Sequence, residues 1–185
     1  GFAVSKNFFN TLTKAKENAQ LDDVYLSVLQ VEKLMELEIP DRASYVRVIL
    51  SELNRIASHL LFYGTYGLDV GAMTPVLYAF KEREKIQNFF ESVTGARMMH
   101  NYFRIGGIKE ELPDNFNNRL QLLLEEVSKG IEECDQLLSK NEMFLARTKN
   151  VGVISASDAV DFGVSGRNLR ASGVARDIRV SKPYS

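Results

Sequence analysis

Apolar residues in the first half of the chain recur every three or four positions, the spacing that predicts amphipathic helices. A first helical pattern covers residues 24–39 and stops at Pro40. A stronger one covers 41–63, with Asp41 expected as its N-cap and Arg47 lying away from its apolar stripe. That stripe consists of Val46, Ile49, Leu50, Leu53, Ile56, Ala57, Leu60 and Leu61.

The segment 64–74 interrupts this periodicity with three glycines, which can adopt positive φ. We therefore expect a turn of small residues that carries the carboxylate of Asp69 between apolar neighbours. Thr74 is expected as the N-cap of the following helix and Pro75 as its first residue. An aspartate in such a turn either bonds nearby backbone amides or serves a functional site, and spacing alone favours the former.

Two further helices are predicted around an irregular connection. The first covers 75–93 and places Arg83 within its apolar stripe, where an unpaired charge is costly, so a structural ion pair is the favoured interpretation. The connection, 95–113, is rich in arginine, aromatic residues and glycine. The second helix covers 114–140, is capped by its first residue, Asp114, and carries Cys134 on its apolar face.

The character of the chain changes after Asn150. Residues 151–155 predict a short strand or a buried extended segment. The sequence "SASD" predicts a capping box that opens a short helix ending at Phe162. Residues 163–174, which are rich in glycine and serine, are expected to form a loop.

These patterns predict a mainly α fold: a bundle of long helices with short β or extended elements near the C-terminal end. We divide the chain into a helical core, residues 1–150, and a truncated segment, residues 151–185, that combines a short strand, a short helix and a basic loop. The basic character comes from Arg167, Arg170, Arg176, Arg179 and Lys182, which could face an acidic partner or form a solvated surface.

Composition narrows the functional classes. A hydrophobic fraction of 45% in 185 residues is enough for a sizeable core, and a net charge of −1 gives no indication of a nucleic-acid partner. Cys134 is the single cysteine, so no internal disulfide can form, which fits a reducing compartment. No apolar run approaches the roughly 18 residues of a membrane span, so we expect membrane contact only through partners.

Common catalytic motifs are absent from the sequence. "GVSG" is not a nucleophile elbow, and no phosphate loop or metal-ligand spacing is present. For His59 a structural role is favoured. For His100, which is close to Arg97 and Arg104, structural and functional interpretations are balanced; the neighbouring cations would lower its pKa and favour the neutral imidazole.

Several long motifs then carry a family resemblance. From Val31 to Tyr184 the chain contains, in order, "VEKLMELEIPDRASYVRVILSELNRIASHLL", "LDVGAMTP", "FKEREK", "TGARMMHNYFRIGG", "LP" and "VGVISASDAVDFGVSGRNLRASGVARDIRVSKPY". Together they resemble the D subunit of bacterial NADH–quinone oxidoreductase, respiratory complex I. The motifs "RMMHNYFRIGG" and "NLRASGV" are most similar to those of Gram-positive, cyanobacterial and chloroplast members. This family is distantly related to the large subunit of nickel–iron hydrogenases but has lost the metal-binding cysteines.

The resemblance implies roles for individual residues. Asp69 matches the catalytic carboxylate that partners a quinone-binding histidine. The wall of the quinone cavity is expected to include Thr65, Tyr66 and Met73, and the segment close to a neighbour's [4Fe–4S] cluster to include Arg97, His100 and Arg104. This chain is expected to bind no metal or cofactor itself, while NAD(H) binds a distant subunit.

The resemblance also implies a setting. The expected partners are quinone, the terminal iron–sulfur subunit and the C-type subunit of complex I, with no nucleic acid. The enzyme is a proton-pumping NADH:quinone oxidoreductase. The expected location is peripheral, on the cytoplasmic face of the cell membrane or on the stromal side of the thylakoid for a plastid-type member.

Departures from the family pattern concern the quinone site. The "HRG-x-EK" motif, which holds the quinone-binding histidine, does not occur in this sequence, and Glu17 stands where its tyrosine partner is expected. Tyr66 replaces the histidine of "THALD", and Met99 occupies the histidine position of "RMH", with His100 next. We therefore interpret the chain as a fragment lacking both ends and expect it to be inactive alone. The alternative is a purely structural helical module without a site; a metal-bearing hydrogenase-like subunit conflicts with the single cysteine.

Overall fold

The computed structural model describes residues 21–181, so Glu17 and the last residues of the family resemblance lie outside the described part. Tertiary contacts divide the chain into two compact units, Gly1–Ser139 and Lys140–Ser185. The change in composition had placed the boundary after Asn150, some ten residues later.

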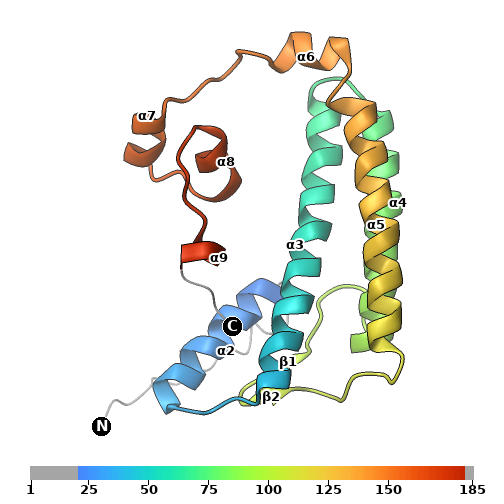
Figure 1. Cartoon of the computed structure of the whole chain (residues 1–185), viewed down its shortest axis with the longest axis vertical. Helices are drawn as coiled ribbons and strands as arrows, with labels where there is room; N and C mark the ends of the chain where they lie inside the picture. The colour runs from blue at the N-terminus through green and yellow to red at the C-terminus, as the bar shows by residue number, and fades with distance from the viewer. Residues whose placement is uncertain (1–20, 182–185) are drawn as a thin grey trace. The chain divides into compact units, whose positions relative to one another are not determined.

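Long helices build the first unit and confirm the mainly α prediction. They are α2 (Leu21–Met35), α3 (Asp41–Asp69), α4 (Thr74–Thr94) and α5 (Phe116–Leu138). Figure 1 shows α3, α4 and α5 running side by side, and the contacts place α4 between the other two. Their apolar stripes meet in a core that includes Leu50, Leu53, Ala57, Ala79, Ile86, Phe90, Leu123 and Val127.

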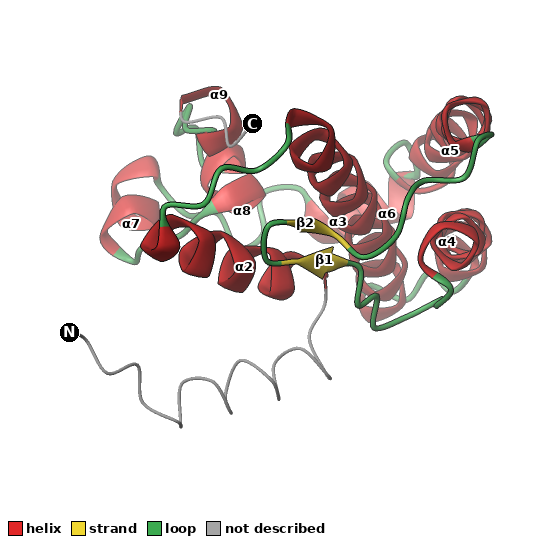
Figure 2. Ribbon diagram, turned by 90° about the horizontal axis from the view of Figure 1, so that it is seen from below, coloured by secondary structure: helices red, strands yellow, loops and turns green. Residues whose placement is uncertain are grey.

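The small sheet of this unit lies in the connection between α4 and α5. Strand β1 (Phe103–Arg104) pairs antiparallel with β2 (Gly107–Ile108). Figure 2 shows the hairpin next to α2 and α3, and the ring of Tyr25 packs on that of Phe103 at 5.4 Å. A β-hairpin this short depends on such packing for its stability.

The prediction of a short strand or buried segment at 151–155 is wrong. No strand forms there in the described part of the second unit, and the side chains of Val151, Val153 and Ile154 are exposed. The apolar alternation has no neighbouring strand to pair with, so these residues form a bend followed by an irregular surface segment.

Helix α3 continues beyond Tyr63, so the predicted turn at 64–74 is much shorter than expected. Gly64 and Gly67 are helical and buried. A Cβ on Gly64 would lie 3.2 Å from the Cα of Val76, and one on Gly67 3.2 Å from the Cβ of Pro75. These two glycines therefore allow α3 and α4 to approach closely, rather than supplying positive φ.

The predicted N-caps are each displaced by one residue. The cap positions are held by Pro40, Met73 and Asn115, and none of them makes a side-chain cap hydrogen bond. Asp41 and Thr74 are instead the first residues of their helices. A negative charge at such a position still interacts favourably with the helix dipole, which accounts for the sequence signal at Asp41.

The second unit consists of α6 (Glu142–Thr148), α7 (Ala156–Asp161), α8 (Gly166–Ala171) and α9 (Ile178–Ser181). The predicted N-cap at Ser155 is confirmed, because the Asp158 N–H donates to Ser155 Oγ at 3.1 Å. The reciprocal bond of a capping box, from the Ser155 N–H to the carboxylate, is not formed among the described residues; Asp158 Oδ2 accepts from Ser155 Oγ at 2.7 Å instead. The loop predicted over 163–174 contains α8, since burial of Leu169 beside α7 favours a helical turn there. No described helix of either unit has the length and apolar character needed to cross a membrane.

Candidate functional site

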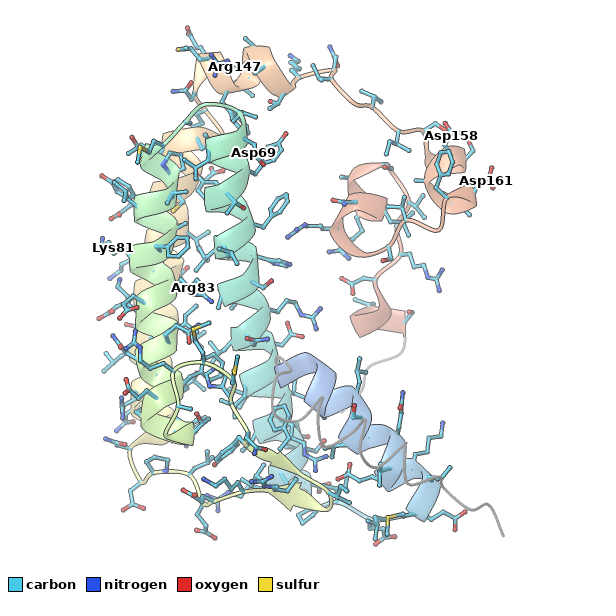
Figure 3. All side chains as sticks on the ribbon, turned by 180° about the vertical axis from the view of Figure 1, so that it is seen from behind. Asp69, Lys81, Arg83, Arg147, Asp158 and Asp161 are labelled. Carbon is cyan, nitrogen blue, oxygen red and sulfur yellow. The ribbon has the colours of Figure 1, made fainter. Side chains whose placement is uncertain are left out.

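Asp69 is the last residue of α3 and its side chain is exposed. Figure 3 shows it at the end of the helix where the chain turns toward α4. Its carboxylate makes no hydrogen bond or ion pair with any residue of the described range 21–181. The expected Asx-type bond to the backbone is therefore not formed, and the carboxylate is available to an external group.

The other predicted cavity residues lie at the same end. Thr65, one turn before Asp69, directs its hydroxyl to the carbonyls of Leu61 and Phe62, at 3.0 and 3.1 Å. Tyr66 stacks on Phe62, with ring centroids 5.7 Å apart and planes 11° apart. Met73, in the turn itself, is 72% exposed. The structure thus brings together all four residues predicted for the quinone side.

We call residues 61–80 the apolar tip. Asp69 is its single charged residue, although the sequence on either side is rich in charge. Exposed apolar side chains concentrated in one segment are a candidate for an interaction or ligand-binding region. The exposed large side chains of the apolar tip are Leu61, Phe62, Tyr66, Leu68, Met73, Leu77, Tyr78 and Phe80.

The residues predicted to lie near an iron–sulfur cluster are at the opposite end of α4. That helix has 21 residues, which at the usual helical rise separates the two groups by about 30 Å. Within the first unit, the structure therefore does not bring Arg97, His100 and Arg104 next to Asp69.

Arg97 is held against one face of α4. Its guanidinium donates to Glu84, to Asn88 and, at 3.3 Å, to Glu91, three side chains spaced one turn apart. The hydrogen bond to Glu84 is the main cause that raises the pKa of Arg97 above its usual value. Arg97 therefore remains a fixed, half-exposed cation with two carboxylates around it.

His100 is only 5% exposed, and its ring stacks on Phe90 at 4.2 Å. Its Nδ1 lies 2.9 Å from the carbonyl oxygen of Ala96, an arrangement in which Nδ1 carries the proton. The pKa of His100 is lowered, as predicted, but the cause is burial rather than the neighbouring arginines. Arg104 points elsewhere, donating to Asn101 at 3.0 Å.

A buried ion pair that the sequence pattern did not predict joins three elements. Arg47, which was expected away from the core, is 1% exposed and donates to both carboxylate oxygens of Glu32, at 2.9 and 2.7 Å. The same guanidinium donates to the carbonyls of Arg104 and Gly107, and Glu32 accepts the N–H of Gly106 at 2.7 Å. The one available signal was an acid, Glu32, inside the apolar pattern of α2.

In the middle of α4 the buried ion pair is formed by Glu82 and Lys85 rather than by Arg83, for which it was predicted. Glu82 is 2% exposed and sits against Gly130 of α5, with Lys85 Nζ 2.8 Å from its Oε2. Arg83 has no carboxylate within ion-pair distance among the described residues, so the predicted structural ion pair is wrong there. Figure 3 shows Lys81 on the outer side of α4 and Arg83 on the side toward α3.

A cavity of about 340 Å³ lies between α3 and α5. Its wall includes Leu60, His59 and Cys134, and the Tyr63 hydroxyl donates to the Cys134 carbonyl at 2.6 Å. Burial, together with the negative charge that Cys134 and Asp135 carry when they are ionised, raises the pKa of Tyr63 to about 12. His59 lies on the rim of this cavity rather than at the apolar tip.

The chain offers no fit for a resident iron–sulfur cluster. A [4Fe–4S] cluster is normally held by four cysteine thiolates, and the sequence has one cysteine. Burial raises the pKa of the Cys134 thiol, which keeps it protonated. Among residues 21–181 no group of three or more His, Cys, Asp or Glu side chains is arranged to bind a metal ion.

Comparisons with known proteins place these features in a family. Residues 69–185 match the model of the "Respiratory-chain NADH dehydrogenase, 49 Kd subunit". The chain is 52% identical over 157 residues to the NADH-quinone oxidoreductase D subunit of Deinococcus radiodurans, covering 85% of this chain and 39% of the relative. It is 49% identical over 167 residues to a D subunit of the same enzyme from Chloroflexus aurantiacus, covering 90% and 41%.

A third relative, NADH-quinone oxidoreductase subunit 4 of Thermus thermophilus, is 52% identical over 157 residues, covering 85% of this chain and 38% of the relative. The chain thus spans about two fifths of the length of these relatives. The resemblance to the D subunit is confirmed, while the likeness to Gram-positive, cyanobacterial and chloroplast members and the relation to nickel–iron hydrogenases stay predictions. This chain belongs to the family of the 49 Kd subunit of respiratory-chain NADH dehydrogenase.

Proposed function

We propose that this chain is part of the quinone-reducing subunit of a proton-pumping NADH:quinone oxidoreductase. The apolar tip forms part of the wall of the quinone cavity, and a neighbouring subunit holds the iron–sulfur cluster that supplies electrons. The observation that carries the proposal is Asp69: an exposed carboxylate without a partner in the described residues, surrounded by apolar side chains, at the start of the family match. The chain alone is inactive in this proposal.

The hydrogen-bonding groups of the apolar tip, the Asp69 carboxylate and the Thr65 hydroxyl, indicate what Asp69 does in this proposal. Reduction of a quinone requires protons at its oxygens, and a positioned donor assists their transfer. An ionised carboxylate only accepts hydrogen bonds, and the hydroxyl hydrogen of Thr65 is directed to backbone carbonyls. Asp69 is therefore a positioning residue, which orients and charges a donor supplied by another part of the complex.

The apolar side chains have a complementary role. Tyr66 and Met73, with the stacked ring of Phe62, present surface to an apolar ring or chain. The segment that carries Arg97, His100 and Arg104, at the far end of α4, lies near the subunit that holds the cluster. The chain is peripheral to the membrane on its cytoplasmic side, and its partners include the terminal iron–sulfur subunit and the C-type subunit.

The test is Asp69→Asn in the intact complex. The substitution preserves size and removes the charge, so we expect normal assembly with quinone reduction or proton coupling reduced by roughly tenfold or more. Asp114→Asn is the matched control, because Asp114 is also exposed but lies before α5, outside the apolar tip. Assembly is measured by native electrophoresis, and activity by NADH oxidation with an added quinone.

The second candidate is a structural module that scaffolds the complex and has no site of its own. The exposed apolar side chains of the tip favour it, because any protein interface would use them equally well. Normal coupled activity of the Asp69→Asn complex would support the scaffold and contradict the quinone-site role.

A further inference from the structure

The cavity between α3 and α5 has an apolar interior. Its volume of about 340 Å³ is larger than the roughly 150 Å³ that holds a benzene ring. Ile56 and Leu60 of α3 line one side of it, and Ile131 of α5 lines the other. Leu60 is 6% exposed and Ile131 is 43% exposed, so the cavity extends from the core of the first unit to its surface. An apolar group the size of one ring can therefore enter it from solvent.

The polar groups around the cavity offer mainly hydrogen-bond acceptors. The Tyr63 hydroxyl donates its hydrogen to the Cys134 carbonyl at 2.6 Å, so its oxygen can only accept a further bond. The carboxylate of Asp135, also in the wall, has no hydrogen-bond or ion-pair partner among residues 21–181. Ser139 adds a hydroxyl, which accepts as well as donates. Of the residues that line the cavity, His59 on its rim is the one that can become a cation.

The electrostatic environment of the cavity is negative. Cations are favoured at the C-terminal end of a helix, yet the last turn of α5 contains no basic residue and instead carries Asp135. Burial raises the pKa of Tyr63 to about 12, and the charge of Asp135 contributes to this rise. Lys81 of α4 is paired with Glu82 and Glu133. No lysine or arginine lines the cavity, so the negative end of α5 and its carboxylate meet there without a cation in the wall.

We propose that the cavity between α3 and α5 binds an organic ammonium ion, with the apolar stem between Leu60 and Ile131 and the charged group at the Asp135 carboxylate. An ammonium group supplies the hydrogen-bond donors and the positive charge that the wall lacks. An anion would be repelled by Asp135, and a neutral apolar ligand would leave its carboxylate without a counter-ion. The inference does not rest on the role of Asp69.

Methyl NMR of the full 185-residue chain tests the site directly. With labelled isoleucine methyl groups, Ile56 and Ile131 report on the cavity, while Ile105 and Ile108 of the hairpin serve as references. The probe is phenethylammonium at pH 8, where histidine is ordinarily neutral, and 2-phenylethanol is the neutral ligand of the same shape. We expect the probe to shift the two cavity signals and to bind roughly fivefold more tightly than the alcohol at low salt. Equal affinities, or equal shifts at the references, would overturn the proposal.

Two substitutions separate the charge of the site from its space. Asp135→Asn keeps the size of the side chain and should lower the affinity for phenethylammonium to that for the alcohol. Ile131→Trp fills the cavity and should abolish the binding of both. Both positions are exposed, so each variant should keep the circular dichroism of the wild type. Asp114→Asn, at the other end of α5, is the matched control and should leave both affinities unchanged. An Asp135→Asn variant that still prefers the ammonium ion would contradict the assignment.

The intact complex distinguishes two sources of the ammonium group: a free amine, or a lysine from the rest of the subunit, of which this chain spans about two fifths in its relatives. A photoreactive phenethylammonium labels α5 in the complex if the site takes free amines. If a lysine occupies the cavity, the probe labels the isolated chain only, and a carbodiimide joins that lysine to Asp135 as an amide, taking up the water that is lost. Neither label nor amide at α5 in the complex would overturn the proposal. Either result leaves the Asp69→Asn test unaffected.

Discussion

Arg47 and Glu32 form a two-pronged ion pair whose side chains are at most 3% exposed. The pair joins α2 to α3, and its remaining hydrogen bonds fix the hairpin at Gly106 and Gly107. Each charged group thus makes further hydrogen bonds besides those to its partner. A buried ion pair stabilises the folded state only when such additional bonds offset the loss of solvation.

Removal of one member of this pair should destabilise the first unit. Arg47→Ala removes the counter-ion of the buried Glu32 carboxylate, which keeps only the Gly106 N–H, and removes a donor from two carbonyls, so we expect a loss of about 3–5 kcal/mol in the free energy of unfolding. Urea unfolding followed by circular dichroism measures it. Arg42→Ala, a change to an exposed arginine of the same helix, is the control and should have an effect below about 0.5 kcal/mol. Equal effects of the two substitutions would contradict the assignment.

Gly130→Ala should also destabilise the protein, against the usual preference for alanine in a helix interior. A Cβ at this position would lie 2.1 Å from Cδ of Glu82, so the buried carboxylate and its ion pair with Lys85 must move. We expect a loss of about 1–3 kcal/mol from this overpacking. The measurement is thermal unfolding, with Ser128→Ala on the exposed side of α5 as the control. A stabilised Gly130→Ala variant would show that the Glu82 side chain does not occupy the space beside Gly130.

His100 should make the stability depend on pH. Burial lowers its folded pKa below 6.5, while in the unfolded chain the value stays near the ordinary one of about 6.5. The unfolded state therefore binds the proton first. The contribution of His100 to stability is complete above about pH 6.5 and is lost as the pH falls toward the folded pKa.

Unfolding free energies between about pH 5.5 and 7.5 test this dependence, since most carboxylates titrate below that window. His100→Phe, which keeps a ring for stacking on Phe90, should flatten the curve. His59→Gln is the control for a histidine on an exposed rim. A wild-type slope retained by the His100→Phe variant would rule out His100 as its source.

The isolated chain should self-associate through its apolar tip. Leu77 is 64% exposed there, and Leu77→Lys places a charge in the centre of the contact. We expect the dissociation constant from sedimentation velocity to increase by roughly tenfold or more. Leu122→Lys on α5 is the matched control, because Leu122 is 61% exposed but lies outside the tip. A monomeric wild-type chain at high concentration would contradict the prediction.

The spacing of apolar residues predicts the long helices, because it is a local property that any packing must satisfy. The sequence also predicts the cap at Ser155 and the burial of Cys134, each of which follows from a short pattern. The family motifs supplied Asp69 and its neighbours as candidates, since local motifs can be matched without knowledge of the fold.

The ends of the helices and the burial of particular charges depend on contacts between distant parts of the chain. Helix α3 passes through Gly64 because Val76 of α4 lies against it, and α8 forms because Leu169 is buried beside α7. Arg47 bonds Gly107, which is 60 positions away in the chain. The periodicity of one helix carries no information about a partner so distant, and a charge becomes structural only when folding removes it from water.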